Sequence, residues 1–128
     1  MCEVQAPSLT QLPDDTRAPA LARAFLRAAA CEAHHARVLD EAELLVSELV
    51  TNAVLHGAPP ITMRVECDGS NGLRVSVTDN NPEPAQVRQA GPADESGRGM
   101  RLVDVISDDW GVEPRTDVGK DVWFRLRS

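Results

Sequence analysis

The sequence predicts an α+β fold, a two-layer sandwich with a mixed, mostly antiparallel sheet and about three helices on one face. Helical spacing of apolar residues marks three segments, 17–31, 37–56 and 99–106. Strict alternation of apolar and polar residues marks three strands, 61–67, 73–79 and 121–127. The first two strands are separated only by the turn DGSNG, which favours a hairpin, and helices on both sides of that hairpin favour an α+β sandwich.

Bulk composition narrows the class of protein. A length of 128 residues suits one domain, 1–128. The formal net charge of −7 argues against a surface for nucleic acid or anionic membrane. There is neither a bilayer-length apolar run nor a signal-peptide pattern, and the three cysteines lack metal-ligand spacing. We therefore expect a cytoplasmic protein that contacts neither membrane nor nucleic acid directly.

The amino-terminal third should hold one short extended segment and two helices. Residues 1–16 predict a loop or a short edge strand that ends at a helix cap. The Ala-rich helix 17–31 should turn Leu21, Phe25 and Ala28 inward. The next helix should end at Gly57, because the prolines that follow prevent it from restarting.

The second helix contains SELVTNAVLHG, residues 47–57, in which Glu48, Asn52 and His56 recur every four positions. Its apolar residues surround most of the helix, which predicts a buried helix with Glu48 and Asn52 between two apolar groups. Either these polar side chains are satisfied by neighbouring backbone, or they form a site. For a Glu–Asn pair one turn apart, we favour a site.

Two further features carry chemistry. The alternation in 73–79 places Asp79 on the core face, where a carboxylate needs a donor. The segment 80–98 is too long for an ordinary loop in a compact domain, which favours a functional role. It leads to a helix start flanked by Gly97 and Gly99, and the free N–H groups of such a start bind phosphate; alone, however, glycines there are common caps.

Together these residues describe an ATP site. A carboxylate in an apolar pocket can accept a hydrogen bond from the exocyclic amino group of adenine. An amide oxygen beside a carboxylate suits Mg²⁺, which bridges phosphates and keeps several waters. The order of these features along the chain carries more weight than any one of them.

At this point the sequence resembles a known superfamily. SELVTNAVLHG, VSVTDNNP, SGRGMRLVDVISDDWGVEP and GKDVWFRL resemble the N box, the two glycine boxes and the final strand of the Bergerat-fold ATPases. The nearest resemblance is to single-domain bacterial anti-sigma-factor serine kinases and their histidine-kinase-like relatives. It covers about residues 17–127.

The resemblance implies a role for each matching residue. Asn52 would coordinate Mg²⁺, Asp79 would accept the adenine amino group, and Glu48 would be the base that deprotonates a partner's serine. The loop 80–98 would be the nucleotide lid. The backbone that faces the phosphates would come from the second glycine box, Gly97, Arg98, Gly99 and Met100.

One departure concerns the first glycine box, which usually has two spaced glycines after its Asp. Here the segment reads DNNPEP, and Asn81 stands where it can tolerate a positive φ. His56 and Lys120 align near the site, and Lys120 is counted among its nucleotide-binding residues without a specific role.

The expected function is that of an ATP- and Mg²⁺-dependent serine kinase that phosphorylates an antagonist protein. By the same resemblance its partners would be a sigma factor and an anti-anti-sigma-type protein, and it could form a homodimer. The alternative is a binding module that sequesters a partner without kinase activity. The altered first glycine box favours this alternative. A histidine-kinase fragment is disfavoured, because we expect no dimerisation helices before residue 17.

Overall fold

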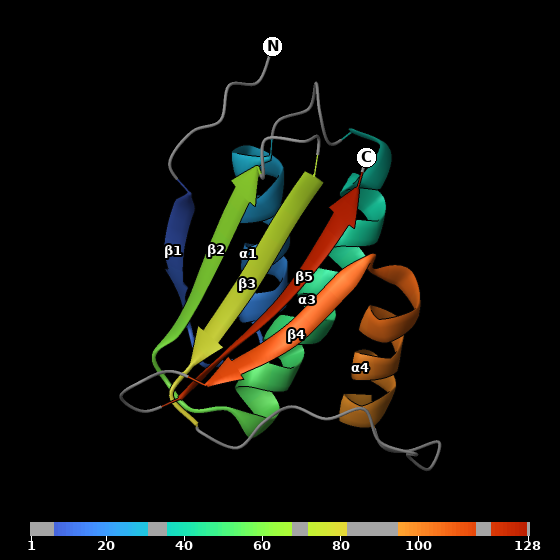
Figure 1. The fold of residues 1–128 in the computed structure, drawn as a ribbon. Coiled ribbons are helices and arrows are strands. Elements are labelled where there is room, and N and C mark those ends of the chain that lie inside the picture. The colour runs from blue at the N-terminus through green and yellow to red at the C-terminus, as the bar shows by residue number, and fades with distance from the viewer. Residues whose placement is uncertain (1–6, 31–35, 68–71, 82–94, 115–118, 128) are drawn as a thin grey trace.

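The computed structural model describes residues 7–30, 36–67, 72–81, 95–114 and 119–127 (Figure 1). In these ranges the chain forms a two-layer α+β sandwich, as predicted. Its elements are β1 (Ser8–Leu12), α1 (Ala18–Ala29), the 3-10 turn η1 (Ala36–Val38), α3 (Leu39–His56), β2 (Ile61–Cys67), β3 (Gly72–Asp79), α4 (Glu95–Ile106), β4 (Asp109–Pro114) and β5 (Lys120–Arg127).

The strands form one sheet in the order β1-β2-β3-β5-β4. Each neighbouring pair among the described strands is antiparallel, so the sheet is antiparallel throughout where a mixed one was allowed for. The amino-terminal segment supplies β1, which lies at the sheet edge beside β2. The long connection from β3 to α4 and β4 places β5 between β3 and β4, which brings the ends of β3 and β5 together.

The core lies between the sheet and the helix layer. In Figure 1 all three α-helices cover the same face of the sheet. The alternating strand residues point into this space and are buried, including Ile61, Met63, Val75 and Phe124. Among the described helices, the central helix α3 contributes the most buried side chains to the core, including Leu45, Val46, Leu49 and Val50. It contacts α1, α4 and the sheet, so both of the other α-helices pack against it.

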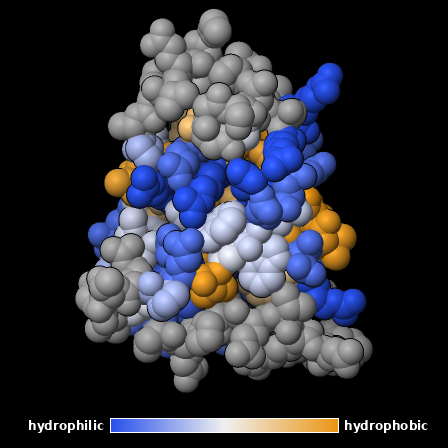
Figure 2. Space-filling model, in the orientation of Figure 1, coloured by the Kyte–Doolittle hydropathy of each residue, from blue (hydrophilic) through white to orange (hydrophobic). Residues whose placement is uncertain are grey.

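The opposite face of the sheet is open and polar. Figure 2 shows this face as mainly hydrophilic. Arg74 lies over the ring of Trp123, with its guanidinium carbon 4.6 Å from the ring centroid, and also pairs with Glu66. Arg125 pairs with Asp109 across β4 and β5. None of the helices in the described part of the chain combines the length and apolar character that a membrane span requires.

The inward face of α1 differs from the prediction. Of the three residues predicted inward, Phe25 packs against the core, whereas Leu21 is 47% exposed and Ala28 is exposed. The buried residues are Ala18, Ala22 and Leu26. The predicted and the observed inward faces both fit the spacing of a helix. The observed face places small alanines against the neighbouring layer. α1 and α3 can then pack closely along their length.

Two further predictions about helices need correction. α3 is not buried all round, because Leu44 is 42% exposed and Leu55 is 58% exposed. The third helix begins at Glu95 rather than at residue 99, so Gly97 and Gly99 lie inside α4 instead of flanking its start. Glycine lowers helix stability by about 1 kcal/mol relative to alanine but does not end a helix by itself.

Candidate functional site

Asp79 and Lys120 lie opposite each other at one end of the neighbouring strands β3 and β5. Both side chains are turned to the core and are almost completely buried, Asp79 at 2% and Lys120 at 7% exposure. The Lys120 ammonium lies 3.2 Å from each oxygen of the Asp79 carboxylate. A buried carboxylate is therefore paired with a buried ammonium, as burial of either charge requires.

Asn81 connects this ion pair to the end of the central helix. Its backbone N–H donates to Asp79 Oδ1 at 2.8 Å, and its side-chain amide donates to the carbonyl of His56 at 2.6 Å. Its own carbonyl accepts from Lys120 Nζ at 3.1 Å. Since Asn81 is not a glycine, it holds this corner through its side chain, which a glycine in the usual box could not do.

Gly57 ends α3 and is in direct contact with the Asp79 carboxylate. Its N–H donates to Ala53 O at 2.9 Å, which closes the helix. A Cβ built at Gly57 would lie 2.6 Å from the Cγ of Asp79 and 2.8 Å from its Oδ2. Only glycine lets the helix end approach the carboxylate this closely.

Gly119, directly before Lys120, is the second glycine that the corner requires. It has φ of 109°, and a Cβ there would lie 2.2 Å from the backbone oxygen of Asp79. Its positive φ and the lack of space both exclude a side chain. Lys120 is thus presented to Asp79 by a backbone conformation that few other residues adopt.

Glu48 and Asn52 lie on the same helix, before its end at Gly57, and both are half-buried. At about 1.5 Å per residue, Asn52 precedes Gly57 by roughly 7.5 Å along the axis and Glu48 by roughly 13.5 Å. Glu48 and Asn52 are therefore not enclosed as the prediction of a buried helix implied. They form a partly exposed row that leads along α3 toward the buried carboxylate.

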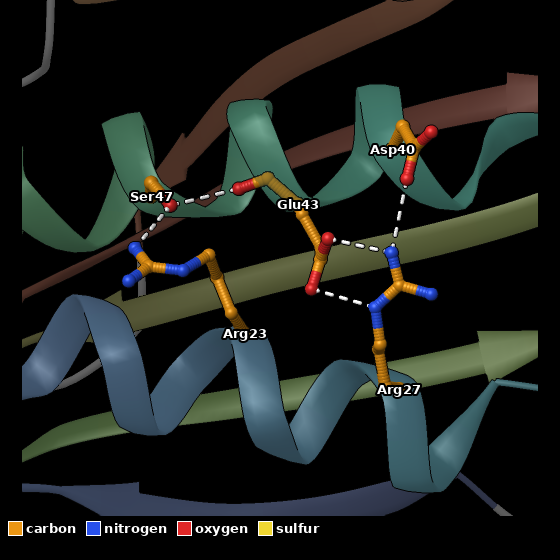
Figure 3. Close-up of polar contacts among 5 residues, drawn as sticks. All are labelled: Arg23, Arg27, Asp40, Glu43 and Ser47. Carbon is orange, nitrogen blue, oxygen red and sulfur yellow. Dashed lines mark hydrogen bonds and ion pairs between the residues drawn. The ribbon is translucent and has the colours of Figure 1, made fainter.

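A polar seam joins α1 to α3 (Figure 3). Arg27 makes a two-point contact with Glu43, at 2.8 and 2.7 Å, and a third hydrogen bond with Asp40 at 3.0 Å. Arg23 donates to Ser47 Oγ at 3.0 Å, and that hydroxyl donates to Glu43 O at 2.8 Å. Ser47, the first residue of the N box, is thus hydrogen-bonded to α1. Hydrogen bonding by Arg27 lowers the pKa of Glu43.

The second glycine box lies in the first turns of α4. With a helix that begins at Glu95, the backbone N–H groups without an intrahelical acceptor are those of residues 95–98, which include Gly97 and Arg98. Gly99 and Met100 lie beyond that first turn. The Met100 side chain is 1% exposed and belongs to the core.

The structure therefore joins Asp79, Asn81 and Lys120 directly, and places Glu48 and Asn52 on the helix that ends against them. The sequence assigns Lys120 no specific role and predicts Gly57 only as the end of a helix. The signal for Lys120 was present in the alternation: Val122, Phe124 and Leu126 point inward, so Lys120 does too. No such signal marks the contact of Gly57 with Asp79, which depends on tertiary packing.

Among the described residues, no cluster of three or more His, Cys, Asp or Glu side chains is placed to hold a metal ion. The donor set still fits a nucleotide with its metal. Mg²⁺ is commonly held by one or two protein oxygens together with phosphates and waters, and Asn52 offers an amide oxygen. Oδ1 of Asp79 already accepts two hydrogen bonds, whereas Oδ2 has acceptor capacity left within the described part of the chain.

Comparison with known proteins agrees with this architecture. A family model described as a histidine kinase-like ATPase domain matches residues 12–126. An uncharacterized protein of Streptomyces coelicolor is 40% identical over 76 residues, which cover 56% of this chain and 72% of that protein. The crystal structure of the RsbU and RsbW domains of Rv1364c from Mycobacterium tuberculosis matches with a TM-score of 0.66 and 20% identity. That match covers 96% of this chain and 32% of the other, so this chain spans about a third of its structural neighbour's length.

Proposed function

The chain belongs to the family of histidine kinase-like ATPase domains, and from that membership we propose that it binds ATP with Mg²⁺ and acts as a regulatory protein serine kinase. The observation that carries the proposal is the buried Asp79 carboxylate at the end of the N-box helix, with one oxygen still able to accept. The edge of a base that reaches the Asp79 carboxylate is shielded from water. A hydrogen bond formed there distinguishes strongly between bases that supply a donor and bases that do not.

Each residue of the site has a part in this proposal. Asp79 Oδ2 accepts one N–H of the adenine amino group, and Asn52 offers its amide oxygen to Mg²⁺. The first-turn N–H groups of α4 face the phosphates, with Gly97 leaving room for close approach. ATP supplies the transferable phosphoryl group, whose transfer depends mainly on positioning and charge neutralisation.

Glu48 is the proposed general base. It lies one turn before Asn52 on α3, so a hydroxyl held near the metal would be within its reach. Its half-buried position leaves it open to a serine presented by another protein. It would accept that hydroxyl proton as the oxygen attacks.

The proposed protein substrate is an antagonist of the anti-anti-sigma type, and the proposed regulated partner is a sigma factor. This assignment rests on the resemblance of the N box and the second glycine box to anti-sigma-factor serine kinases. The structural likeness to a protein with an RsbW domain is compatible with it. A homodimer belongs to the same proposal.

The experiment pairs two substitutions on α3. Asn52→Ala should abolish the Mg²⁺-dependent part of ATP binding in calorimetric titration, because a metal ligand is removed. Glu48→Gln should bind Mg-ATP like the parent yet lose phosphotransfer by about 10²-fold or more, because only the base is removed.

Ser47→Ala is the matched control, since it lies in the same box but is engaged with Arg23 on the α1 side. It should bind and transfer like the parent. Unchanged Mg-ATP affinity in Asn52→Ala would remove Asn52 from the site. Parent-level transfer by Glu48→Gln would exclude Glu48 as the base.

One observation favours the alternative, a sequestering module without kinase activity. The Asp79 side chain is 2% exposed and already paired with Lys120, so the fold is complete without a ligand at this carboxylate. In that case a partner protein would bind the chain with the same affinity in the presence and absence of Mg-ATP. Dependence of partner binding on the nucleotide would favour the kinase.

A further inference from the structure

We infer that the edge of the molecule formed by β1 and α1 is an interface with a second copy of this chain, in which two β1 strands pair antiparallel and join the two sheets into one. The inference gives a surface to the homodimer of the proposed function, and rests on that proposal only for the expectation that two copies associate. It is carried by an edge strand without charge, by an exposed apolar side of the neighbouring helix, and by the contrast with the opposite edge.

β1 lies at one end of the sheet, with β2 as its neighbour on the inner side (Figure 1). Alternate N–H and C=O groups of an antiparallel edge strand point away from the sheet and can pair with a further strand. The strand reads SLTQL, without a charged residue or a proline, and Leu9 is 61% exposed. Natural edge strands are usually protected by charge, proline or a bulge. The sequence of β1 therefore leaves it open to pairing.

α1 is the helix at this edge, because it contacts β1 and β2. Its charged residues, Arg23 and Arg27, both bond to α3. Leu21 lies about 200° around the helix from Arg23 and so turns away from α3. Leu21 is 47% exposed, and Ala28, two turns further on along the same side, is exposed as well. The outer side of α1 is therefore apolar and uncharged.

A second copy explains why this side of α1 is apolar. The spacing of Leu21, Phe25 and Ala28 predicts a buried side, yet a single copy leaves it partly in water. A two-fold axis perpendicular to the sheet would pair β1 with its copy and keep both α1 helices on the same face of the joined sheet. The two outer sides would then face each other, and removing their apolar area from water would stabilise the pairing.

The opposite edge of the molecule is charged. β4 carries Asp109 and Glu113, and α4, which contacts β4, has Arg101 and Asp104 exposed. Antiparallel pairing of two β4 strands about Gly111 would set Asp109 of one copy opposite Glu113 of the other. Like charges directly opposite each other destabilise a strand pair. Of the two edges of the sheet, only the β1 edge can therefore pair with its own copy without repulsion.

Charge also favours a second copy over a different protein at the β1 edge. With a formal net charge of −7, two copies repel each other, and they can approach most closely where the surface carries no charge. A different partner of so acidic a chain would be selected by complementary charge, which neither β1 nor the outer side of α1 offers. An uncharged strand needs no such partner, because it matches its own antiparallel copy about a two-fold axis.

The interface leaves the candidate site free. The Asp79–Lys120 pair lies on β3 and β5, and β2 separates these strands from β1. Loss of the dimer should therefore leave Mg-ATP binding unchanged. A monomeric parent that binds Mg-ATP would overturn this inference alone, whereas a dimer that binds no nucleotide would contradict the proposed kinase and keep the interface.

The test is the molar mass of the full chain, measured by light scattering after size-exclusion chromatography over a dilution series. We expect the parent to form a dimer with twice the mass of 13.9 kDa. Leu9→Lys introduces the charge that protects natural edge strands, and Leu21→Glu introduces a charge on the helix side of the same edge. Each should weaken the dimer by about tenfold or more, because each buries an unpaired charge at the interface.

Val105→Glu is the matched control. Val105 lies on α4 and is 79% exposed, more than either leucine, so this variant tests nonspecific association of apolar surface. It should keep the dimer of the parent. A parent that stays monomeric would overturn the inference, as would a dimer that neither Leu9→Lys nor Leu21→Glu weakens. Dissociation by Val105→Glu would place the interface elsewhere and would overturn it too.

Hydrogen exchange of the parent covers the case in which a variant does not fold. The amides of β1 should exchange more slowly as the protein concentration rises and the dimer forms, because the outward N–H groups become hydrogen-bonded. The amides of β4 should exchange at the same rate throughout. Exchange in β1 that does not depend on concentration would contradict the strand pairing even if the chain were a dimer.

Discussion

At the residue scale, the contact of Gly57 with Asp79 has a direct consequence for substitution. Gly57→Ala would place a Cβ 2.6 Å from both Ala53 O and Asp79 Cγ, so either the end of α3 or the carboxylate must shift. Overpacking of this kind destabilises by about 1–3 kcal/mol. We expect urea unfolding to show such a loss, together with weaker adenosine diphosphate binding in calorimetry.

Gly111→Ala is the control for that prediction. Its Cβ would lie 2.9 Å from the indole nitrogen of Trp123, on the open face of the sheet and away from Asp79. It should lower stability without a loss of nucleotide affinity. A Gly57→Ala protein that binds adenosine diphosphate like the parent would show that the close approach matters only for folding.

Residues also show where sequence reasoning stops. Asp79 was predicted on the core face from strand alternation, and it is there. Its ion pair with Lys120 depends on β5 being inserted beside β3, which alternation does not specify. The contact with Gly57 depends on how a helix end meets a strand end, and no local pattern encodes that distance.

At the element scale, the polar seam between α1 and α3 predicts that the stability of the fold depends on pH. Hydrogen bonding by Arg27 lowers the pKa of Glu43 from its usual 4.5. A carboxyl with a lowered folded-state pKa stabilises the fold above pH 4.5, and this contribution is lost as the pH falls through the lower folded-state value. Glu43→Gln should therefore be modestly less stable than the parent at pH 7, and the difference should vanish in acid.

Thermal unfolding followed from pH 7 to pH 3 checks this prediction. Asp40→Asn is the matched control, because Asp40 bonds the same Arg27 but its side chain is 96% exposed. Its effect should be smaller, and high salt should reduce both. A Glu43→Gln protein whose deficit persists unchanged in acid would show that the seam acts through packing rather than charge.

The ranges of elements were predicted well where one face is buried and the other is exposed to solvent. The predictions were less accurate for the other elements. The ranges of β2 and β3 follow from strict alternation, since a one-residue slip would expose every core side chain. The predicted inward face of α1 was right for Phe25 and wrong for Leu21 and Ala28, because alanine fits either side of a helix. The predicted start of α4 is wrong because Gly97 and Gly99 were expected to flank the helix, whereas they lie inside its first turns.

At the scale of the whole molecule, the position of α3 links the site to overall stability. It contacts α1 on one side, α4 on the other and the sheet beneath. A shift of its end at Gly57 would therefore disturb the packing of the core. The site is thus built from the same contacts that hold the two layers together. Ligand binding and global unfolding should therefore be coupled.

This coupling predicts a single unfolding transition that Mg-ATP shifts as one. Trp110 on β4 donates to Asp104 of α4 at 2.8 Å, and Trp123 lies on β5, so tryptophan fluorescence reports on both layers. At a concentration of 100 times Kd, a ligand that binds only the native state adds about 2.7 kcal/mol to the free energy of unfolding. Fluorescence and far-UV circular dichroism should give coincident transitions with and without Mg-ATP. Asn52→Ala should keep the coincidence but lose the shift, because its metal ligand is absent and its fold is intact. Two separate transitions in the parent would instead mean that the helix layer unfolds independently of the sheet, and the proposed link between site and core would be wrong.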